Sequence, residues 1–356
     1  MDLKQLTAQP KGAVHTGVKV VHDPHDYGDG LLHYTIATAD GSKLVSLAGG
    51  AHELNITGEN PPDPAPAPPT PVPPAPAAQV VVGMNCPWFC TGNDTGQAYA
   101  QVDELLPKVI RDPGLKQARW DHAASKGVQM MPLLESPNIS ALAWAVKHPA
   151  FSGVVELSNE PFWNGISAAS WVNTWAPVID GIKQDYPDVK LLAPIDDWPA
   201  SRSSGPGTAA WTEQLLAARP SLKTEIYGWA IHPYEDDSPT LALAHLQNGI
   251  DALRANGIPS PRMFCTEWGW SRFNVTEAVQ ATNAQAFLKG VALKPEVEWV
   301  FWYQLNDTLR QGATGWNRDA GFGLLREPAS ANWDDLWAKA SVWQVMRDAI
   351  SASPVA

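Results

Sequence analysis

The chain has 356 residues, 44% of them hydrophobic and 17% charged, which is enough for one large domain with a smaller unit beside it. Its formal net charge of −12 and pI near 5.1 argue against nucleic acid or an anionic membrane surface as the main partner. No apolar run approaches the ~20 residues of a membrane helix, and residues 1–20 show no secretory signal. Three cysteines cannot build a disulfide framework, and no His/Cys cluster has metal-ligand spacing, so we expect no metal and no cofactor.

The N-terminal segment shows strand patterns. Leu31–Ala37 and Lys43–Ala48 are joined through Asp40-Gly41, a pair typical of tight hairpin turns. Val18–Val21 is a candidate third strand. The segment contains no Trp and no Phe, so its core would be thin, and a unit of this size is marginally stable alone. We therefore expect residues 1–58 to dock to an oligomer or to a larger assembly.

A proline-rich stretch separates this segment from the rest of the chain. Residues 61–76 contain ten prolines, which exclude helix and central strand and favour an extended spacer roughly 50 Å long. A plain linker is the main interpretation, and a ligand for an SH3-type domain is the alternative. The organisation we expect is a small β-rich segment over 1–58, a linker over 59–79 and a large domain over 80–356.

From residue 80 onward, short apolar runs alternate with helical stretches. The candidate strands are Val80–Met84, Leu115–Arg119, Val128–Leu134, Val154–Leu157, Val189–Pro194, Tyr227–His232, Arg262–Cys265 and Val297–Tyr303. Eight strands that alternate with helices predict an α/β fold, a (β/α)8 TIM barrel. The rival, a doubly wound open sheet, would bring a glycine-rich phosphate loop after its first strand, and Gly83-Met-Asn-Cys-Pro-Trp88 is not one.

Two of these runs lead into a glutamate. The fourth run continues into Asn159-Glu160-Pro161, and the seventh continues into Glu267-Trp268-Gly269. In a parallel barrel the active site lies at the carboxyl ends of the strands, so both glutamates would point into the same mouth from different sides. A single glutamate at a strand end is most often a solvated loop charge, and the pair is the informative feature.

Two carboxyl groups across a cleft are what hydrolysis of a glycosidic bond needs. One group must be protonated to help the leaving oxygen depart. The other must be ionised to attack the anomeric carbon or to activate water. Like charges held close together separate their pKa values, so one site can supply an acid and a base at the same pH.

Four motifs, in this order, resemble the retaining glycoside hydrolases of clan A, which are (β/α)8 barrels. They are Asn159-Glu160-Pro161, His232-Pro233-Tyr234, Thr266-Glu267-Trp268-Gly269-Trp270 and Phe301-Trp302-Tyr303. The tail from Phe301 to Asp307, followed by Gly321-Phe322-Gly323-Leu324-Leu325, looks most like bacterial relatives of families 39 and 5. The resemblance covers Val80 to Ile350 and says nothing about the N-terminal segment.

The resemblance implies that Glu160 is the general acid and then the general base, and that Glu267 is the nucleophile. Retention would place their carboxyl groups ~5–5.5 Å apart. Asn159 would bind the sugar hydroxyl beside the anomeric carbon, and Tyr234 would donate to Glu267. His232 would line the same mouth.

Two further roles follow from the same resemblance. Trp302 would form the floor beneath the sugar that is cleaved. Arg119, at the end of the expected second strand, matches the arginine that clan members place near the nucleophile. An arginine and a tyrosine hydroxyl both stabilise a carboxylate and lower its pKa.

Several residues keep two interpretations. Glu135 stands where many clan members have a histidine, and it is either a ligand for sugar hydroxyls or a loop charge. Glu156 shares strand parity with Glu160 and is a rival acid, although a buried structural role is favoured. Trp198 and Trp268 fall on expected mouth loops, where sugar stacking competes with core packing.

The sequence therefore predicts a retaining, endo-acting hydrolase of a β-linked polysaccharide such as a glucan, mannan, xylan or exopolysaccharide. The 17 tryptophans of an acidic chain favour sugar binding. The alternative is a carbohydrate-binding or adhesion protein, or a part of a virion or surface assembly, with little turnover. We expect a polysaccharide or oligosaccharide partner, no nucleic acid and no membrane, and an extracellular, virion-associated or surface-associated protein.

Overall fold

The computed structural model describes residues 80–85, 96–162, 164–195, 207–234, 238–272, 274–305, 321–326 and 338–354, together with the backbone of five strands before residue 60. The chain divides into two compact units, Met1–Ala75 and Pro76–Ala356. The first unit holds small sheets, and the second holds a closed barrel.

The first unit contains a three-stranded antiparallel sheet in the order β2-β3-β4. Its strands are β2 (Val18–Asp26), β3 (Leu32–Thr38) and β4 (Leu44–Gly49). Two short strands, β1 (Val14–His15) and β5 (Asn55–Ile56), pair in parallel. The three strands expected here are present, and β2 runs beyond Val21 because its pairing with β3 continues to Asp26.

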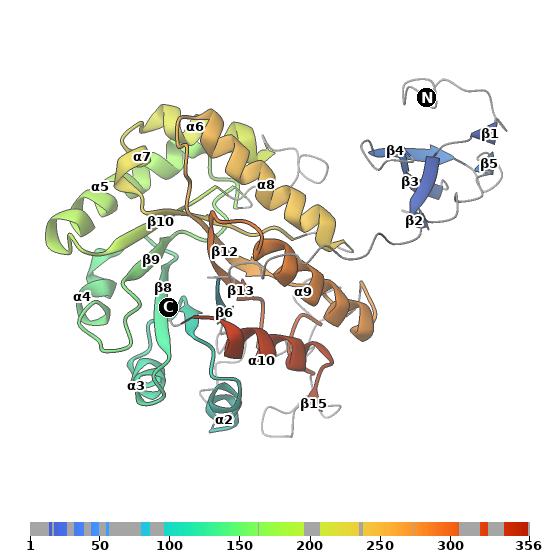
Figure 1. Cartoon of the computed structure of the whole chain (residues 1–356). Helices are drawn as coiled ribbons and strands as arrows, with labels where there is room; N and C mark the ends of the chain where they lie inside the picture. The colour runs from blue at the N-terminus through green and yellow to red at the C-terminus, as the bar shows by residue number, and fades with distance from the viewer. Residues whose placement is uncertain are drawn as a thin grey trace, which may run out of the picture. The chain divides into compact units, whose positions relative to one another are not determined.

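The second unit is a closed barrel of eight parallel strands (Figure 1). The strands are β6 (Val81–Asn85), β7 (Val109–Asp112), β8 (Gln129–Leu134), β9 (Val154–Leu157), β10 (Lys190–Pro194), β11 (Gly228–Ile231), β12 (Met263–Trp268) and β13 (Val297–Trp302). β13 pairs with β6, which closes the sheet. The predicted (β/α)8 barrel is confirmed.

Helices surround the strands as an outer layer (Figure 1). They are α2 (Gly96–Leu105), α3 (Gln117–Ser125), α4 (Leu142–Ala145), α5 (Ala168–Asp185), α6 (Gly207–Ala218), α7 (Leu222–Glu225), α8 (Pro239–Ala255), α9 (Glu277–Val291) and α10 (Val342–Ala352), with a 3₁₀ turn at Ile139–Ala141. The side chains of Ser167, Ser238 and Thr276 cap α5, α8 and α9 by accepting hydrogen bonds from first-turn N–H groups. Within the described part of the chain, the helices lack the length and apolar character of a membrane span.

The second strand differs from the one expected over Leu115–Arg119. β7 is the four-residue segment Val109–Asp112, and it ends there because Pro113 cannot donate a ladder hydrogen bond. Leu115 has a φ of 44°, which is incompatible with a strand, and residues 117–125 form α3. The expected strand is therefore wrong, and Arg119 lies on a helix.

Alternate residues of a strand point to the same face, so every second side chain enters the barrel. The inner apolar side chains form one cluster, which consists of Val81, Val109, Met131, Val154, Leu192, Ala230, Phe264, Trp299 and Phe301. Two residues further along their strands, Arg111, Glu156 and Thr266 are buried polar residues. The apolar cluster thus forms a floor beneath polar groups at the carboxyl ends.

Gly228 leaves room for Phe264 in this floor. A Cβ at position 228 would lie 2.3 Å from Cε2 of Phe264 and 3.0 Å from Cδ2 of Leu192. We expect Gly228→Ala to lower the free energy of unfolding by about 1–3 kcal/mol, the usual cost of overpacking. Urea denaturation measures the change. The control, Leu293→Ala at a 75% exposed position, should stay within ~0.5 kcal/mol of the wild type, and an equally small change in Gly228→Ala would contradict this packing.

Candidate active site

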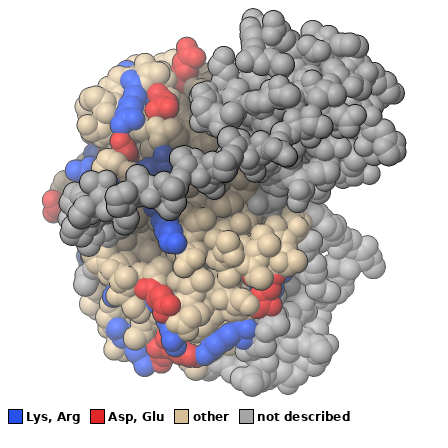
Figure 2. All heavy atoms as spheres, turned by 45° about the vertical axis from the view of Figure 1, so that its right-hand side comes forward, with Lys and Arg blue, Asp and Glu red and all other residues tan. Residues whose placement is uncertain are grey.

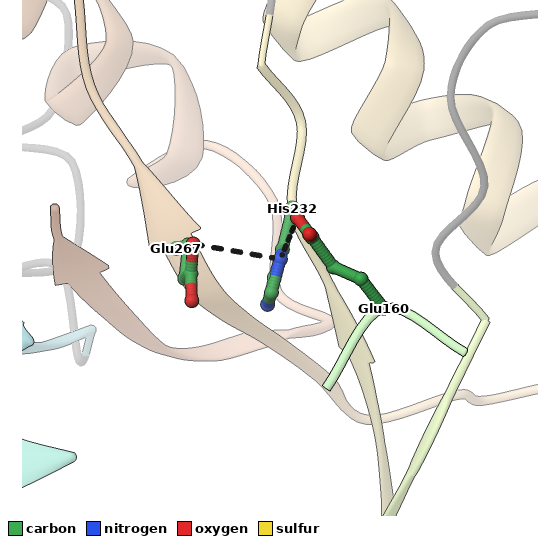
Figure 3. A group of neighbouring side chains, drawn as sticks. All are labelled: Glu160, His232 and Glu267. Atoms are coloured by element: carbon green, nitrogen blue, oxygen red, sulfur yellow. Dashed lines mark hydrogen bonds and ion pairs between the residues drawn. The ribbon is translucent and has the colours of Figure 1, made fainter. Parts of the chain in front are cut away.

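Polar side chains converge at the carboxyl ends of the barrel strands. Glu267 lies on β12, His232 directly follows β11, and Glu160 lies in the turn after β9. Figure 3 shows the imidazole of His232 in contact with both carboxyl groups. Its Nδ1 is 2.9 Å from Oε1 of Glu160 and 3.7 Å from Oε2 of Glu267. An oxygen of each carboxyl group and a ring nitrogen all lie within 4.8 Å of one another, so the two glutamates do meet.

Arg111 on β7 binds four polar side chains at once. Its Nη1 donates to Oε1 of Glu267 at 2.5 Å and to Oδ1 of Asn85 at 3.0 Å. Its Nη2 donates to Oδ1 of Asn159 at 2.7 Å and to Oε1 of Glu156 at 3.0 Å, and its Nε donates to the other oxygen of Glu156. Arg111 and Glu156 are buried, so each charge compensates the other.

Glu156 is a fixed negative charge beneath the site. Burial alone would raise the pKa of its carboxyl group, but the charge of Arg111 and the contacts with His232 and Arg111 outweigh burial and lower the pKa to about 2. Burial likewise works against the charged form of Arg111, and the carboxylates of Glu156 and Glu267 more than offset it and raise its pKa. Glu156 therefore stays ionised near neutral pH, which fits the buried structural role favoured from the sequence.

Tyr234 supports Glu267 from the other side. Its hydroxyl donates to Oε2 of Glu267 at 2.9 Å. Burial raises the pKa of Tyr234 well above its usual value, and interactions with Glu267, Tyr303 and Glu160 raise it further. The phenol therefore keeps its proton and remains a donor. Each oxygen of Glu267 accepts a hydrogen bond, one from Arg111 and one from Tyr234, and together the two bonds fix the orientation of the carboxyl group.

The turn that presents Glu160 has an unusual backbone. Ser158 has a φ of 69° and Glu160 has a φ of 41°. Residues other than glycine rarely adopt a positive φ. The side-chain amide of Asn164 donates to the carbonyl oxygen of Asn159 at 3.2 Å and to that of Glu160 at 3.1 Å, which holds the turn. The sequence analysis missed Asn164, because an asparagine in a loop carries no local signal for such a contact.

Arg119 does not lie beside Glu267 as expected. It is buried on α3, where its Nη1 is 3.6 Å from Oδ1 of Asp112, while Nε1 of Trp120 donates to Oδ2 of the same carboxylate at 2.9 Å. Arg119 therefore supports the end of β7. The arginine beside Glu267 is Arg111. The sequence signal for Arg111 is weak: it lies in the short apolar run that forms β7, Val109–Asp112.

Trp302 and Trp268 are packed in the core. Trp302 is 0% exposed, and its Nε1 donates to the carbonyl oxygen of Phe322 at 3.1 Å. Trp268 is 1% exposed, stacks on Phe287 with ring centroids 4.6 Å apart and meets Trp302 edge-on. The expectation that these two tryptophans contact the sugar is therefore wrong, because neither ring has an exposed face.

Tyr303, the residue after Trp302, lies beside the site. It directly follows β13, it is half-buried, and its ring meets that of Tyr234 edge-on with centroids 6.1 Å apart. Glu135 is exposed and directly follows β8, at the same end of the barrel. Trp198 lies outside the described residues.

Glu160, His232 and Glu267 also present ligand atoms close enough to hold a metal ion. Both oxygens of Glu267 already accept hydrogen bonds, one of them from the Arg111 guanidinium at 2.5 Å. A cation bound here would meet that positive charge. The donors therefore fit proton transfer better than cation binding.

Charges of both signs lie on the described part of one face of the molecule. On the face shown in Figure 2, lysine and arginine side chains stand among aspartates, glutamates and uncharged residues.

The closed barrel of eight parallel strands is a fold that this chain shares with solved glycoside hydrolases. No protein-family model and no curated protein sequence matches the chain. Among solved structures, a family 39 glycoside hydrolase from Bacteroides cellulosilyticus WH2 is similar, with a TM-score of 0.53 and 16% identity over 95% of this chain and 81% of that chain.

Two family 128 enzymes share the barrel as well. One is an exo-β-1,3-glucanase (subgroup VI) from Aureobasidium namibiae, with a TM-score of 0.51 and 14% identity over 70% of this chain and 91% of that chain. The other is an endo-β-1,3-glucanase (subgroup II) from Sorangium cellulosum, with a TM-score of 0.50 and 16% identity over 72% of this chain and 96% of that chain. At these identities the similarity confirms the fold.

Removal of the Arg111 guanidinium would leave the buried Glu156 carboxylate without its compensating charge. We expect Arg111→Met to lower the free energy of unfolding by about 3–5 kcal/mol, measured by urea denaturation. Arg254→Met, which removes a more exposed ion pair with Glu296, is the control and should cost less than ~1 kcal/mol. Addition of Glu156→Gln to Arg111→Met should restore part of the loss, and a double variant as unstable as the sum of the single changes would contradict this account.

Proposed function

We propose that the chain is a retaining glycoside hydrolase in which Glu160 is the acid/base and Glu267 is the nucleophile. The observation that carries the proposal is that oxygens of the two carboxyl groups lie within 4.8 Å of each other. Retaining enzymes hold these groups ~5–5.5 Å apart, whereas inverting enzymes separate them by ~6.5–9.5 Å to admit a water molecule.

Their surroundings support the division of roles. The hydrogen bonds from Arg111 and Tyr234 hold the carboxyl group of Glu267 in one orientation. The Glu160 side chain faces His232 and is 21% exposed, against 10% for Glu267. The more exposed group suits the acid, which must reach the leaving oxygen and later water.

In the first step an oxygen of Glu267 attacks the anomeric carbon, and the bond from that carbon to the glycosidic oxygen breaks. Glu160 transfers its proton to this oxygen, which departs as a hydroxyl group of the leaving sugar. The remaining sugar is then an ester of Glu267. Because Arg111 binds Oδ1 of Asn159, the amide nitrogen of Asn159 is assigned as the donor to the sugar hydroxyl next to the anomeric carbon.

In the second step Glu160, now ionised, takes a proton from a water molecule. The water oxygen attacks the anomeric carbon and releases the Glu267 carboxylate. Each step inverts the configuration at the anomeric carbon, so the product retains the configuration of the bond that was cleaved.

The substrate class we propose is a β-linked polysaccharide cut within the chain, with β-1,3-glucan as the first candidate. Two structurally similar proteins are β-1,3-glucanases, one exo-acting and one endo-acting.

A polysaccharide substrate fits a protein found outside the cell or on the surface of a virion or cell. Residues 1–58 would attach the barrel to an oligomer or larger assembly, and light scattering that finds the full chain as a uniform monomer would count against that attachment.

Glu160→Gln and Glu267→Gln preserve the shape of the side chains but remove the proton donor and the nucleophile. We expect each to lower kcat/KM by at least ~10²-fold on β-1,3-glucan or on the active member of a panel with β-1,4-glucan, mannan, xylan and exopolysaccharide. Release of reducing ends is the measurement, and Glu213→Gln, exposed on α6, should keep the wild-type rate. A wild-type protein that binds a glycan but cleaves none would instead support the carbohydrate-binding alternative.

The separation of the two glutamates also predicts the stereochemistry. The first sugar released from a β-linked substrate should be the β anomer, which proton NMR detects before mutarotation. An α anomer as the first product would mean inversion and would remove Glu267 from the role of nucleophile.

A further inference from the structure

A chain of hydrogen bonds connects the buried charge of Glu156 to Glu160. The hydroxyl of Thr266 donates to Oε1 of Glu156 at 2.9 Å. The same hydroxyl oxygen is 3.0 Å from Nε2 of His232, whose Nδ1 is 2.9 Å from Oε1 of Glu160. Thr266 and His232 are buried, so these contacts decide where their protons reside.

The proton positions follow from what each group can donate. An ionised carboxylate only accepts, so the single hydroxyl proton of Thr266 goes to Glu156. The Thr266 oxygen must then accept from His232, which places a hydrogen on Nε2. A neutral His232 therefore presents a bare Nδ1 to Glu160, and their 2.9 Å contact is a hydrogen bond only while a proton lies between them.

We propose that Thr266 is a positioning residue that fixes the tautomer of His232 and thereby keeps a proton on the Glu160–His232 pair. The inference rests on the proposed role of Glu160 as the acid. Loss of the shared proton would leave two lone pairs facing each other at 2.9 Å, which is unfavourable. The pair should therefore keep this proton to a higher pH than it would with the opposite tautomer.

Among the described residues, four charged or titratable groups face His232 and Glu160. They are Glu156 on β9, Glu267 on β12, Tyr234 after β11 and, through its ion pairs with both carboxylates, Arg111 on β7. Glu156 and Glu267 favour a protonated ring, which also leaves a proton between Nδ1 and Glu160. None of these groups distinguishes the two tautomers as directly as Thr266, which contacts Nε2 as an acceptor.

An irregularity in β12 lets Glu267 reach the site beside Thr266, which has the same strand parity as Phe264 of the barrel floor. Successive strand residues point to opposite faces, so Thr266 and Glu267 should not both reach the site. The register of β12 against β13 shifts between Cys265 and Trp268, as at a bulge. Both residues therefore contact the polar cluster.

Two substitutions at position 266 test the proposal. Thr266→Val removes the hydroxyl and keeps the shape, whereas Thr266→Ser keeps the hydroxyl. In protein labelled with ¹⁵N-histidine, the ring nitrogen shifts of His232 should report a hydrogen on Nε2 in the wild type and in Thr266→Ser. In Thr266→Val the hydrogen should move to Nδ1, where it can donate to ionised Glu160, and the alkaline limb of the kcat/KM profile should move down by about one pH unit.

The matched control is Thr212→Val, which removes a buried hydroxyl that donates to the carbonyl oxygen of Thr208 at 2.7 Å, away from the site. It should change neither the His232 shifts nor the pH profile. Thr266→Ala gives the same readouts if Thr266→Val does not fold.

An unchanged His232 tautomer in the hydroxyl-free variants would overturn the proposal, whatever the activity. A loss of rate that is equal at every pH, and equal on an aryl glycoside whose leaving group needs no acid, would also overturn it, because the role would then be structural. If the tautomer shifts as expected but the wild type cleaves no glycan, the proposed function fails and the assignment of Thr266 to the tautomer stands.

Discussion

A buried cation organises the polar end of the barrel. Arg111 is 2% exposed, and a charge so far from water is costly unless it is paired and hydrogen-bonded. The fork of its guanidinium meets that requirement with oxygens from β6, β9 and β12 and from the turn after β9. Because the donors of a guanidinium are fixed in one plane, they also fix the relative positions of the groups that accept from them.

The same cation reaches the two candidate catalytic carboxyl groups by different routes, and this gives them different surroundings. It binds Glu267 directly, where a positive charge stabilises the carboxylate. It reaches Glu160 indirectly, by keeping Glu156 ionised as the acceptor for Thr266, which in turn contacts His232. One guanidinium thus binds the proposed nucleophile directly and, under the proposal for Thr266, supports the proton shared by Glu160 and His232.

The sequence predicted those features that depend on local pattern. Glu160 and Glu267 were found because each closes an apolar run and because parallel strands in a barrel direct their carboxyl ends to one mouth. Arg111 was missed because its strand is only four residues long and stops at a proline, which leaves too little alternation to recognise. Trp302 was expected to face the sugar because it lies in one of the four motifs. Its ring is fully buried, so membership of a motif did not reveal which way the side chain points.

The contacts that decide protonation could not be found in this way, since they join residues far apart in the chain. Arg111 and Glu267 are separated by 156 residues, and Glu156 and Thr266 by 110. Their strength depends on a further long-range feature, the apolar floor that includes Phe264 and Trp299. By excluding water from below, this floor lowers the effective dielectric around the polar cluster, so each hydrogen bond is stronger and each unpaired group more costly. The packing of the lower barrel is therefore part of the chemistry above it: if water entered through the floor, it could satisfy Thr266 and His232 in more than one way, and the choice of tautomer would be lost.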